Sequence, residues 1–375
     1  MPILSYLTTT HFDFGAIKML APELARLGVK RPLVVTDKGV RAAGLLERVL
    51  AAMASPDAAV FDDTPGNPTE AATLAALAQY QAQGCDGVVC LGGGSSMDLG
   101  KSVALLAVSG LPLAQYDPLK GGGKHIKGVA PVICVPTTAG TGSEVSVGVV
   151  IILEQGHKLT VASPQLIPRV AICDPELTLG LPPLLTAATG MDAITHCIEA
   201  FLTPQVNPPA EGVALDGLWR GWRAIEAAVH HGATDRDARW QMMMASTEGA
   251  MAFVKGLGAV HSMSHVVGAR HELRAHHGTL NAVILPSVLR FNAEVCADKY
   301  VRLRQAMGLD AGTDIAAAIE ARNAAIGLPR GLAQMGVTPA MIPELVPVAL
   351  ADLAHFGCPR KPSADDYAQL YAQAM

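Results

Sequence analysis

Residues 86–107 read DGVVCLGGGSSMDLGKSVALLA, and they decide the fold of the first half of the chain. A short β-branched run leads into three glycines and two serines, and an Ala/Leu-rich stretch of helical periodicity follows. This order is typical of a parallel sheet with crossover helices. Glycines let a backbone approach a phosphate closely, and a new helix offers unpaired N–H groups. The segment therefore predicts either a nucleotide-phosphate loop or a plain tight turn.

The same alternation surrounds this segment. Strand-like runs cover 32–37, 58–63 and 131–138, and helical stretches cover 41–54 and 69–84. Ligands on such sheets bind at the carboxyl ends of the strands, where Asp37 closes one run and a second Gly/Thr-rich loop follows another. A carboxylate at Asp37 accepts both ribose hydroxyls of an adenosine and repels a 2′-phosphate; the alternative is an ordinary turn-forming Asp. Two loops of this kind on one sheet favour a nucleotide.

The second half of the chain has a helical pattern. Strand signals are sparse, and we expect helices at 184–202, 209–228, 234–254, 296–308 and 313–326. A chain of 375 residues exceeds the usual limit of one core. The sequence therefore predicts an α/β dinucleotide-binding domain over 1–182 and a helical metal-binding and catalytic domain over 183–375.

Candidate metal ligands occur in the helical half. Asp192 and His196 are spaced i, i+4, which places them on one helix face, and His261 and His265 repeat that spacing. The pair His276-His277 follows closely. One Asp with three His suits Fe(II), Zn(II), Mn(II) or Co(II), with a position left open for substrate. A lone histidine on a helix is more often a core residue, but the repeated spacing favours a metal site.

Composition excludes several other classes of protein. The net charge is −5 and 16% of residues are charged, with no dense Lys/Arg run, which argues against nucleic acid as a partner. We see no signal peptide and no apolar run long enough to span a membrane. Seven cysteines are scattered through the chain, which fits reduced thiols in a cytoplasmic protein better than a disulfide framework.

Longer motifs carry a family resemblance. They include GNPTE (66–70), PTTAGTGSEVS (136–146), TAATGMDAITHCIEAF (186–201), KGLGAVHSMSHVVGA (255–269) and HHGTLNAVILPSVLRFN (276–292). With these motifs the chain resembles the iron-containing (group III) alcohol dehydrogenases. The resemblance implies an α/β dinucleotide-binding domain with a parallel sheet, then an all-α domain, the dehydroquinate synthase-like fold. It also implies an active site in the cleft between them.

The resemblance assigns roles to individual residues. It implies a divalent metal, Fe(II) first and Zn(II) second, held by Asp192, His196, His261 and His277. His265 matches a histidine near the metal that is usually not a ligand, and it is the candidate catalytic proton relay. The implied cofactor is NAD, contacted by Asp37, Asn67, Gly93, Gly94, Ser95, Asp98, Thr137, Thr138 and Lys158. The segment before His277 departs from the family in length, so His276 remains an alternative ligand.

The substrate is the least defined expectation. Segments such as LTTTHFDFG and AMAFVKGLG look most like 4-hydroxybutyrate dehydrogenases, which implies exchange of 4-hydroxybutyrate and succinate semialdehyde. Uncharged primary alcohols, diols and other acid-bearing aldehydes are the alternatives. Arg270, Arg274 and Arg360 are available to bind a carboxylate, although each also fits a solvated surface arginine. Family habit implies a homodimer or larger. A non-enzymatic metal-binding protein would not need the cofactor loops and the metal residues together.

Overall fold

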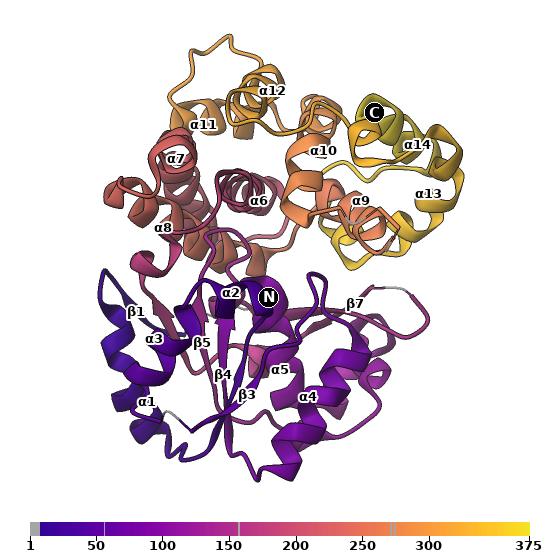
Figure 1. The fold of residues 1–375 in the computed structure, drawn as a ribbon. Helices are drawn as coiled ribbons and strands as arrows, with labels where there is room; N and C mark the ends of the chain where they lie inside the picture. Colours follow the sequence, from indigo (N-terminus) through magenta and orange to yellow (C-terminus); the bar gives the residue numbers. More distant parts are fainter. Residues whose placement is uncertain (1–7, 56, 157, 271, 274) are drawn as a thin grey trace. The chain divides into compact units, whose positions relative to one another are not determined.

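The structure, a computed structural model, describes residues 8–55, 57–156, 158–270, 272–273 and 275–375. The chain divides into two compact units (Figure 1). The α/β unit comprises the described residues up to Thr138 together with Gly142–Gly180. The helical unit comprises Leu181–Met375 and the short segment Ala139–Thr141.

A six-stranded parallel sheet forms the centre of the α/β unit, in the order β1-β8-β5-β4-β2-β3. A separate antiparallel hairpin consists of β6 and β7. The strands are β1 (Thr9–Phe12), β2 (Pro32–Val35), β3 (Ala59–Phe61), β4 (Gly87–Gly92), β5 (Val132–Pro136), β6 (Gly148–Ile152), β7 (Lys158–Ala162) and β8 (Val170–Cys173). The predicted parallel sheet is confirmed, and β1 and β8 extend it beyond the strands expected from sequence.

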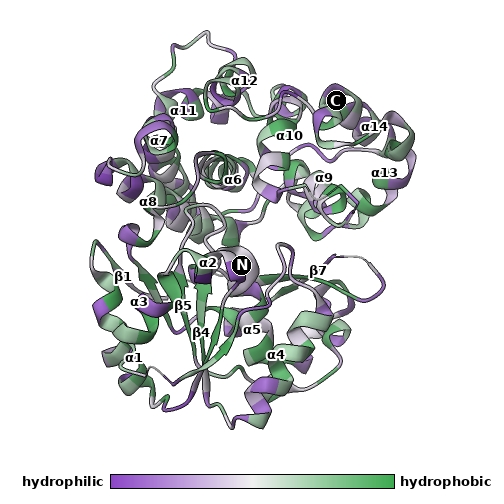
Figure 2. Cartoon of the chain, in the orientation of Figure 1, coloured by the Kyte–Doolittle hydropathy of each residue, from purple (hydrophilic) through white to green (hydrophobic). Residues whose placement is uncertain are grey.

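Continuous apolar runs make these strands because both faces of the sheet are covered. Along β4, Val88 packs into the core on one face, whereas Val89 packs into the core on the other. On the neighbouring strand β5, Val132 and Ile133 divide between the same two cores. Figure 2 shows the strands coloured mainly as hydrophobic. The sheet therefore fixes the ends of its strands firmly.

Helices of the α/β unit connect the strands. They are α1 (Leu20–Leu27), α2 (Lys38–Ala42), α3 (Leu45–Ala52), α4 (Glu70–Ala82) and α5 (Gly94–Ser109). The single helix expected over 41–54 is wrong, since α2 and α3 are separate helices. Gly44 between them has a left-handed φ of 73°, which an α-helix does not contain and which glycine adopts without strain.

The strand order reverses between β2 and β4. After β2 the chain moves to β3 on one side, and after β4 it moves to β5 on the other. Ligands of doubly wound sheets bind outside the carboxyl ends of the strands at this kind of switch point. Asp37 follows β2 and Gly93 follows β4, so both lie beside it.

The helical unit is built around α6, which packs against α7, α8 and α10. Its helices are α6 (Pro183–Leu202), α7 (Pro208–His231), α8 (Arg236–Ala252), α9 (Ala259–Gly268), α10 (His277–Asn292), α11 (Ala297–Met307), α12 (Ile315–Ala325), α13 (Ile342–Ala351) and α14 (Ala364–Gln373). Every residue of α6 from Thr186 to Leu202 is buried, as expected of a helix surrounded by others. Polar side chains on α6 are therefore held inside the unit.

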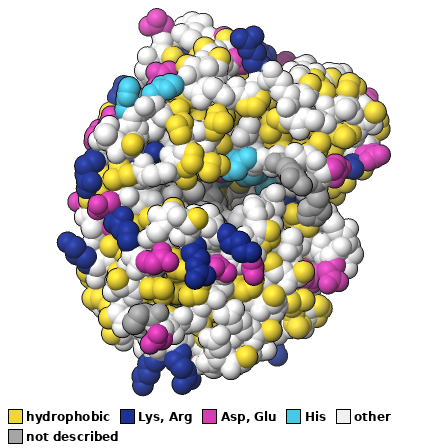
Figure 3. All heavy atoms as spheres, in the orientation of Figure 1, with side chains coloured by type: hydrophobic (Ala, Val, Ile, Leu, Met, Phe, Trp, Pro, Cys, Tyr) yellow, Lys and Arg dark blue, Asp and Glu magenta, His cyan; other side chains and the backbone are white. Residues whose placement is uncertain are grey.

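One face of the molecule carries mixed charge. On the face that Figure 3 shows, Lys and Arg side chains are scattered among Asp and Glu side chains. In the part of the chain that the structure describes, no helix combines the length and the apolar character that a membrane span needs.

Candidate functional site

Three helices bring the predicted ligand atoms together. Asp192 and His196 lie one turn apart on α6, His261 lies on α9, and His277 begins α10. Asp192 Oδ1 lies 3.7 Å from His196 Nε2, 3.9 Å from His261 Nε2 and 3.8 Å from His277 Nε2. The atoms of Asp192, His261 and His277 all lie within 4.8 Å of one another. The Nε2 atoms of the three histidines thus lie within 4 Å of Asp192 Oδ1, and the group of mutually close atoms comprises Asp192, His261 and His277 without His196.

The donor set and its spacing fit a divalent metal. Four donors placed tetrahedrally about 2.1 Å from one ion lie about 3.4 Å apart, and the three separations from Asp192 Oδ1, at 3.7–3.9 Å, are close to that value. Nitrogen and oxygen ligands of this kind suit Fe(II), Zn(II), Mn(II) and Co(II). His277 is the most exposed of the four side chains, at 28%, so solvent reaches the cluster on its side.

Hydrogen bonds to the far ring nitrogens orient two of the histidines. His196 Nδ1 lies 3.2 Å from the carbonyl oxygen of Gly140, and His261 Nδ1 lies 2.6 Å from Glu199 Oε2. When Nδ1 carries the proton, Nε2 keeps its lone pair for a metal. Burial lowers the pKa of His196 to about 4, which keeps that ring neutral. Burial by itself lowers the pKa of His261 too, but the hydrogen bond and charge of Glu199 raise it overall.

Glu199 also organises the start of α9. Its Oε1 accepts a hydrogen bond from the backbone N–H of Val260 at 2.9 Å, and its Oε2 accepts one from the N–H of His261 at 3.4 Å. The carboxylate therefore caps this helix N-terminus, where negative charge is favoured. Gly258 makes room for it, since a Cβ there would lie 2.8 Å from Glu199 Oε1. One side chain thus positions both the helix and its ligand.

The two neighbours His276 and His277 differ in their position relative to the cluster. His277 faces the cluster, whereas His276 is exposed and precedes the first residue of α10. Gly278 allows the close approach of α10 to α6, because a Cβ there would lie 2.2 Å from the carbonyl oxygen of Ala188. The close contact between α10 and α6 therefore explains why a glycine follows His277.

His265 lies beside the cluster with its own partner. Its ring stacks on that of His277, with centroids 5.4 Å apart, and its Nδ1 lies 3.0 Å from Asp352 Oδ2. Burial by itself raises the pKa of Asp352, but the charge and hydrogen bond of His265 lower it overall. Asp352 thus contacts the Nδ1 side of the ring and leaves Nε2 on the other side.

The side chain of Asn281 lies among the ligand atoms. It comes from α10, four residues after His277, and is fully buried. Its Nδ2 lies 2.7 Å from Asp192 Oδ1, 3.2 Å from His261 Nε2 and 3.1 Å from His277 Nε2. An amide nitrogen thus contacts three of the four predicted ligands.

Sequence reasoning missed the supporting residues. Glu199 follows Asp192 and His196 at the i+7 and i+3 spacing of one helix face, and Asn281 follows His277 at i+4. This helical spacing indicates that Glu199 and Asn281 share a helix face with predicted ligands, so both could have been found from sequence. Asp352 carries no such signal, because it lies far along the chain from His265.

The glycine-rich segment of the α/β unit forms a strand-to-helix turn. Gly93 is the N-cap of α5, and a Cβ on it would lie 3.3 Å from the hydroxyl of Thr138. The N–H of Thr137 donates to the carbonyl oxygen of Gly92 at 3.0 Å, which joins the two predicted loops. The first helical residues, Gly94 and Ser95, are partly exposed. A long helix thus presents its N-terminus beside a second loop, as phosphate binding requires.

Asp37 performs a structural role at the same edge. Its Oδ1 accepts hydrogen bonds from the N–H groups of Gly39 and Val40 at 2.8 and 2.9 Å, and so caps α2. Its Oδ2 accepts one from the hydroxyl of Ser96 at 3.3 Å. The negative charge stays at the switch point, and Oδ2 has a further lone pair for a ligand.

Both carboxylate oxygens of Asp98 accept hydrogen bonds from within the α/β unit. Its Oδ1 accepts a hydrogen bond from the hydroxyl of Ser143 at 2.6 Å, and its Oδ2 accepts one from the N–H of Val150 at 2.9 Å. Burial raises the pKa of Asp98. The fully buried Lys101 donates to the carbonyl oxygens of Ser143 and Gly148 at 3.0 and 2.7 Å. These bonds hold the loop after β5, so a cofactor contact by Asp98 stays a prediction.

Two further predicted cofactor residues face each other. Lys158 Nζ donates to Asn67 Oδ1 at 3.4 Å, and the hydroxyl of Ser95 donates to the carbonyl oxygen of Gly66 at 2.7 Å. The GNPTE loop and the start of α5 are therefore neighbours, and the structure brings Asn67, Lys158 and Ser95 to one region of the α/β unit.

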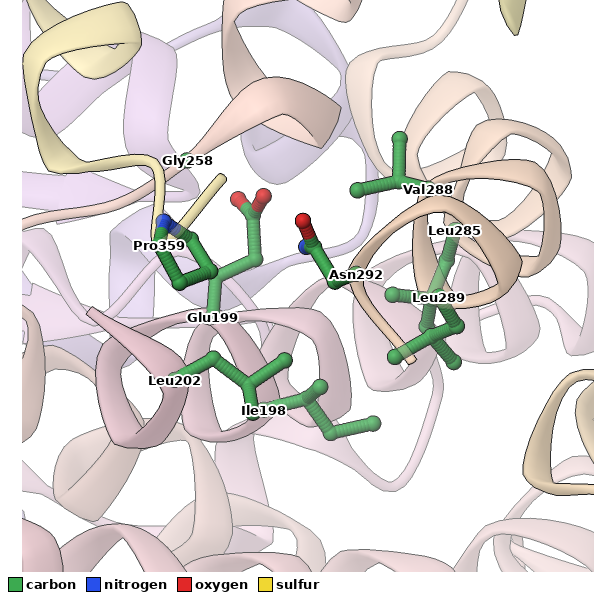
Figure 4. A pocket seen from close by; sticks show the side chains of 9 residues that line it. All are labelled: Ile198, Glu199, Leu202, Gly258, Leu285, Val288, Leu289, Asn292 and Pro359. Carbon is green, nitrogen blue, oxygen red and sulfur yellow. The ribbon is translucent and has the colours of Figure 1, made fainter. Parts of the chain in front are cut away.

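A small pocket lies next to Glu199 in the helical unit (Figure 4). Its lining is Ile198, Glu199, Leu202, Gly258, Leu285, Val288, Leu289, Asn292 and Pro359. Figure 4 shows the Glu199 carboxylate and the Asn292 amide pointing into the same space. The pocket holds about one water molecule, which is too small for an alcohol substrate.

The described arginine candidates for a substrate carboxylate already have acidic partners. Arg270 forms an ion pair with Glu344. Arg360 lies 3.4 Å from Glu294 Oε2 and donates to the carbonyl oxygen of Phe291 at 3.1 Å. Arg274 lies outside the described residues. The structure therefore singles out no arginine for the substrate.

Comparisons with known proteins give similar relatives for both halves of the chain. A family model described as iron-containing alcohol dehydrogenase matches residues 8–175, and its C-terminal counterpart matches 186–375. The chain is 54% identical to a 4-hydroxybutyrate dehydrogenase of Cupriavidus necator, with 100% of each chain covered.

Solved structures share the fold over the same length. A 1,3-propanediol oxidoreductase is 33% identical, with a TM-score of 0.93 and 100% of both chains covered. A sulfoacetaldehyde reductase of Bifidobacterium kashiwanohense in complex with NAD+ is 26% identical, with a TM-score of 0.88 and 100% and 99% coverage. Together with the matched sequence, these likenesses establish that the chain belongs to the iron-containing alcohol dehydrogenase family.

Proposed function

We propose that Asp192, His196, His261 and His277 hold one divalent metal, Fe(II) in preference to Zn(II). The observation that carries this proposal is the convergence of three imidazole Nε2 atoms on Asp192 Oδ1, at 3.7–3.9 Å. The iron named in the family description supports the choice of metal. The hydrogen bonds of His196 and His261 at Nδ1 favour the tautomer in which Nε2 binds a metal.

We infer that the cofactor is NAD, bound at the edge where β2 and β4 end. The N-terminus of α5 and its glycines offer N–H groups to a pyrophosphate, with Thr137 and Thr138 alongside. The charge of Asp37 disfavours the 2′-phosphate of NADP. The NAD+ complex of the related sulfoacetaldehyde reductase supports this cofactor.

The reaction follows from what these residues hold. A bound metal supplies Lewis-acid stabilisation of a deprotonated alcohol oxygen, and bound NAD takes or returns the hydride. Asp192 supplies the one negative charge of the ligand set, and the buried, neutral His196 leaves a net positive charge for the alcohol. His265 passes the alcohol proton at Nε2 while Asp352 retains the proton at Nδ1.

We propose 4-hydroxybutyrate and succinate semialdehyde as the substrate pair. The 54% identity to a 4-hydroxybutyrate dehydrogenase along the entire chain supports it. Uncharged diols and primary alcohols are the second candidate, because Arg270 and Arg360 are engaged by glutamates and the solved 1,3-propanediol oxidoreductase has the same fold.

The experiment compares three alcohols on one enzyme preparation. Metal-stripped protein is reloaded with Fe(II) or Zn(II), and NAD reduction is followed with 4-hydroxybutyrate, 1-butanol and 1,4-butanediol. A kcat/KM at least tenfold higher for the acid supports the first candidate. Activity on the neutral alcohols alone would discard it and favour the second candidate.

We also propose that the enzyme is a homo-oligomer of the cytoplasm. Six of its seven cysteines are buried, which suits a reducing compartment. Light scattering during gel filtration measures the oligomeric state directly, and a mass of one chain would contradict the proposal.

A further inference from the structure

We propose that Asn281 is a placeholder for the metal: its side-chain amide holds the ligand atoms in the metal-free protein and releases them when metal binds. This inference rests on the metal site proposed above. It adds a residue that is not a ligand in that site but competes with the metal for the same atoms.

The orientation of the amide follows from chemistry. The atom at 2.7 Å from Asp192 Oδ1 is Nδ2, because an amide oxygen there would face a carboxylate oxygen without a hydrogen between them. His261 donates its Nδ1 proton to Glu199, so its Nε2 is an acceptor. Nδ2 therefore donates toward Asp192 and His261, and it lies 3.1 Å from His277 Nε2 as well.

The two kinds of contact exclude each other at the histidines. A neutral imidazole has one lone pair at its unprotonated nitrogen. That lone pair either accepts a hydrogen bond from Asn281 or binds a metal. Asp192 Oδ1 has two lone pairs and can do both. Metal binding therefore costs Asn281 its contacts with His261 and His277 and leaves the contact with Asp192.

The surroundings permit the amide to move away. Asn281 is fully buried, and its Oδ1 has no hydrogen-bond partner among the described residues. No hydrogen bond at Oδ1 therefore opposes a rotation of the side chain. Nδ2 has two hydrogens, so without metal it donates to Asp192 and to one of the two histidines at a time, whereas in the loaded protein it retains only the bond to Asp192.

The expected consequence is that removal of the Asn281 amide strengthens metal binding instead of weakening it. Removing the amide destabilises the metal-free state more than the loaded state, and this difference appears as tighter metal binding. We expect Asn281→Ala to lower the Kd for Zn(II) about tenfold. The melting temperature of the metal-free variant should fall by more than that of the loaded variant.

Asn323→Ala is the matched control. Asn323 is also buried in the helical unit, its Nδ2 donates to the carbonyl oxygen of Ala282 at 2.7 Å, and its Oδ1 likewise has no partner among the described residues. Its loss should lower the melting temperature of metal-free and loaded protein equally and leave the Kd for Zn(II) unchanged.

The measurement is a Zn(II) titration of metal-stripped full-length protein against a chelating dye, with thermal unfolding of both states. Tighter binding by Asn281→Ala, with a larger loss of stability in the metal-free state, supports the placeholder. Unchanged or weaker binding overturns it and leaves the metal site standing. If wild-type protein binds no stoichiometric Zn(II), the metal site itself fails and the placeholder with it.

Discussion

Replacing Glu199 with Gln should weaken metal binding by disturbing His261 from behind. The carboxylate accepts three hydrogen bonds, from His261 Nδ1 at 2.6 Å and from the N–H groups of Val260 and His261 at 2.9 and 3.4 Å. All of these donors are buried. An amide presents one oxygen and one NH2 group, so at least one of the three donors then faces another donor.

The magnitude follows from this conflict. A buried donor without an acceptor costs about 1–3 kcal/mol, and hydrogen bonds to charged groups are at the upper end. The part of that cost felt by His261 appears in metal affinity, where partners behind metal ligands are worth about 10- to 100-fold. We therefore expect the Kd for Zn(II) to rise by that factor, which corresponds to about 1.4–2.7 kcal/mol.

The assay is a Zn(II) titration of metal-stripped protein against a chelating dye. Glu248→Gln is the control, because Glu248 is a mostly buried glutamate of the same unit that interacts with Arg220. Gly258→Ala tests the same contact independently, since its Cβ would press on Glu199 Oε1 at 2.8 Å. A Kd for Glu199→Gln within twofold of wild type would refute the reasoning. The rise in Kd expected for Glu199→Gln is opposite in sign to the change expected for Asn281→Ala.

Further predictions concern the histidines, pH and the cofactor. His261→Ala should abolish metal binding and activity together, whereas His265→Ala and Asp352→Asn should slow turnover with metal still bound. Metal analysis and kcat, measured on the same preparation, distinguish these outcomes. A His265→Ala protein without metal would contradict the assignment of His265 as a proton relay. Burial raises the pKa of Glu248 from 4.5 to about 8. Because the folded-state pKa is the higher one, this contribution to stability is complete below about pH 4.5 and is lost as pH rises through 8. Glu248→Gln should therefore gain about 4 kcal/mol over wild type between pH 5 and pH 9 in urea unfolding; parallel curves would exclude it. Asp37→Ser keeps a helix cap but removes the charge, so kcat/KM with NADP relative to NAD should rise at least tenfold, and an unchanged ratio would show that Asp37 does not select the cofactor.

The sequence by itself determined the features that depend on neighbouring residues. Apolar runs followed by glycines gave the strands and turns of the α/β unit, because strand burial and helix starts are local. The spacing of Asp192 and His196 placed them on one face of α6, since 3.6 residues make one helical turn. The break at Gly44 was missed, because a left-handed glycine interrupts a pattern that otherwise continues.

The tertiary structure decided which distant side chains meet. Glu199 and His261 are 62 positions apart, Asp192 and Asn281 are 89 apart, and His265 and Asp352 are 87 apart. These contacts depend on how α6, α9 and α10 pack, and packing follows from shape and burial over whole helices rather than from any local pattern. The sequence alone therefore determined the candidate ligands, and only the packed helices decided which groups orient them and which group competes for them.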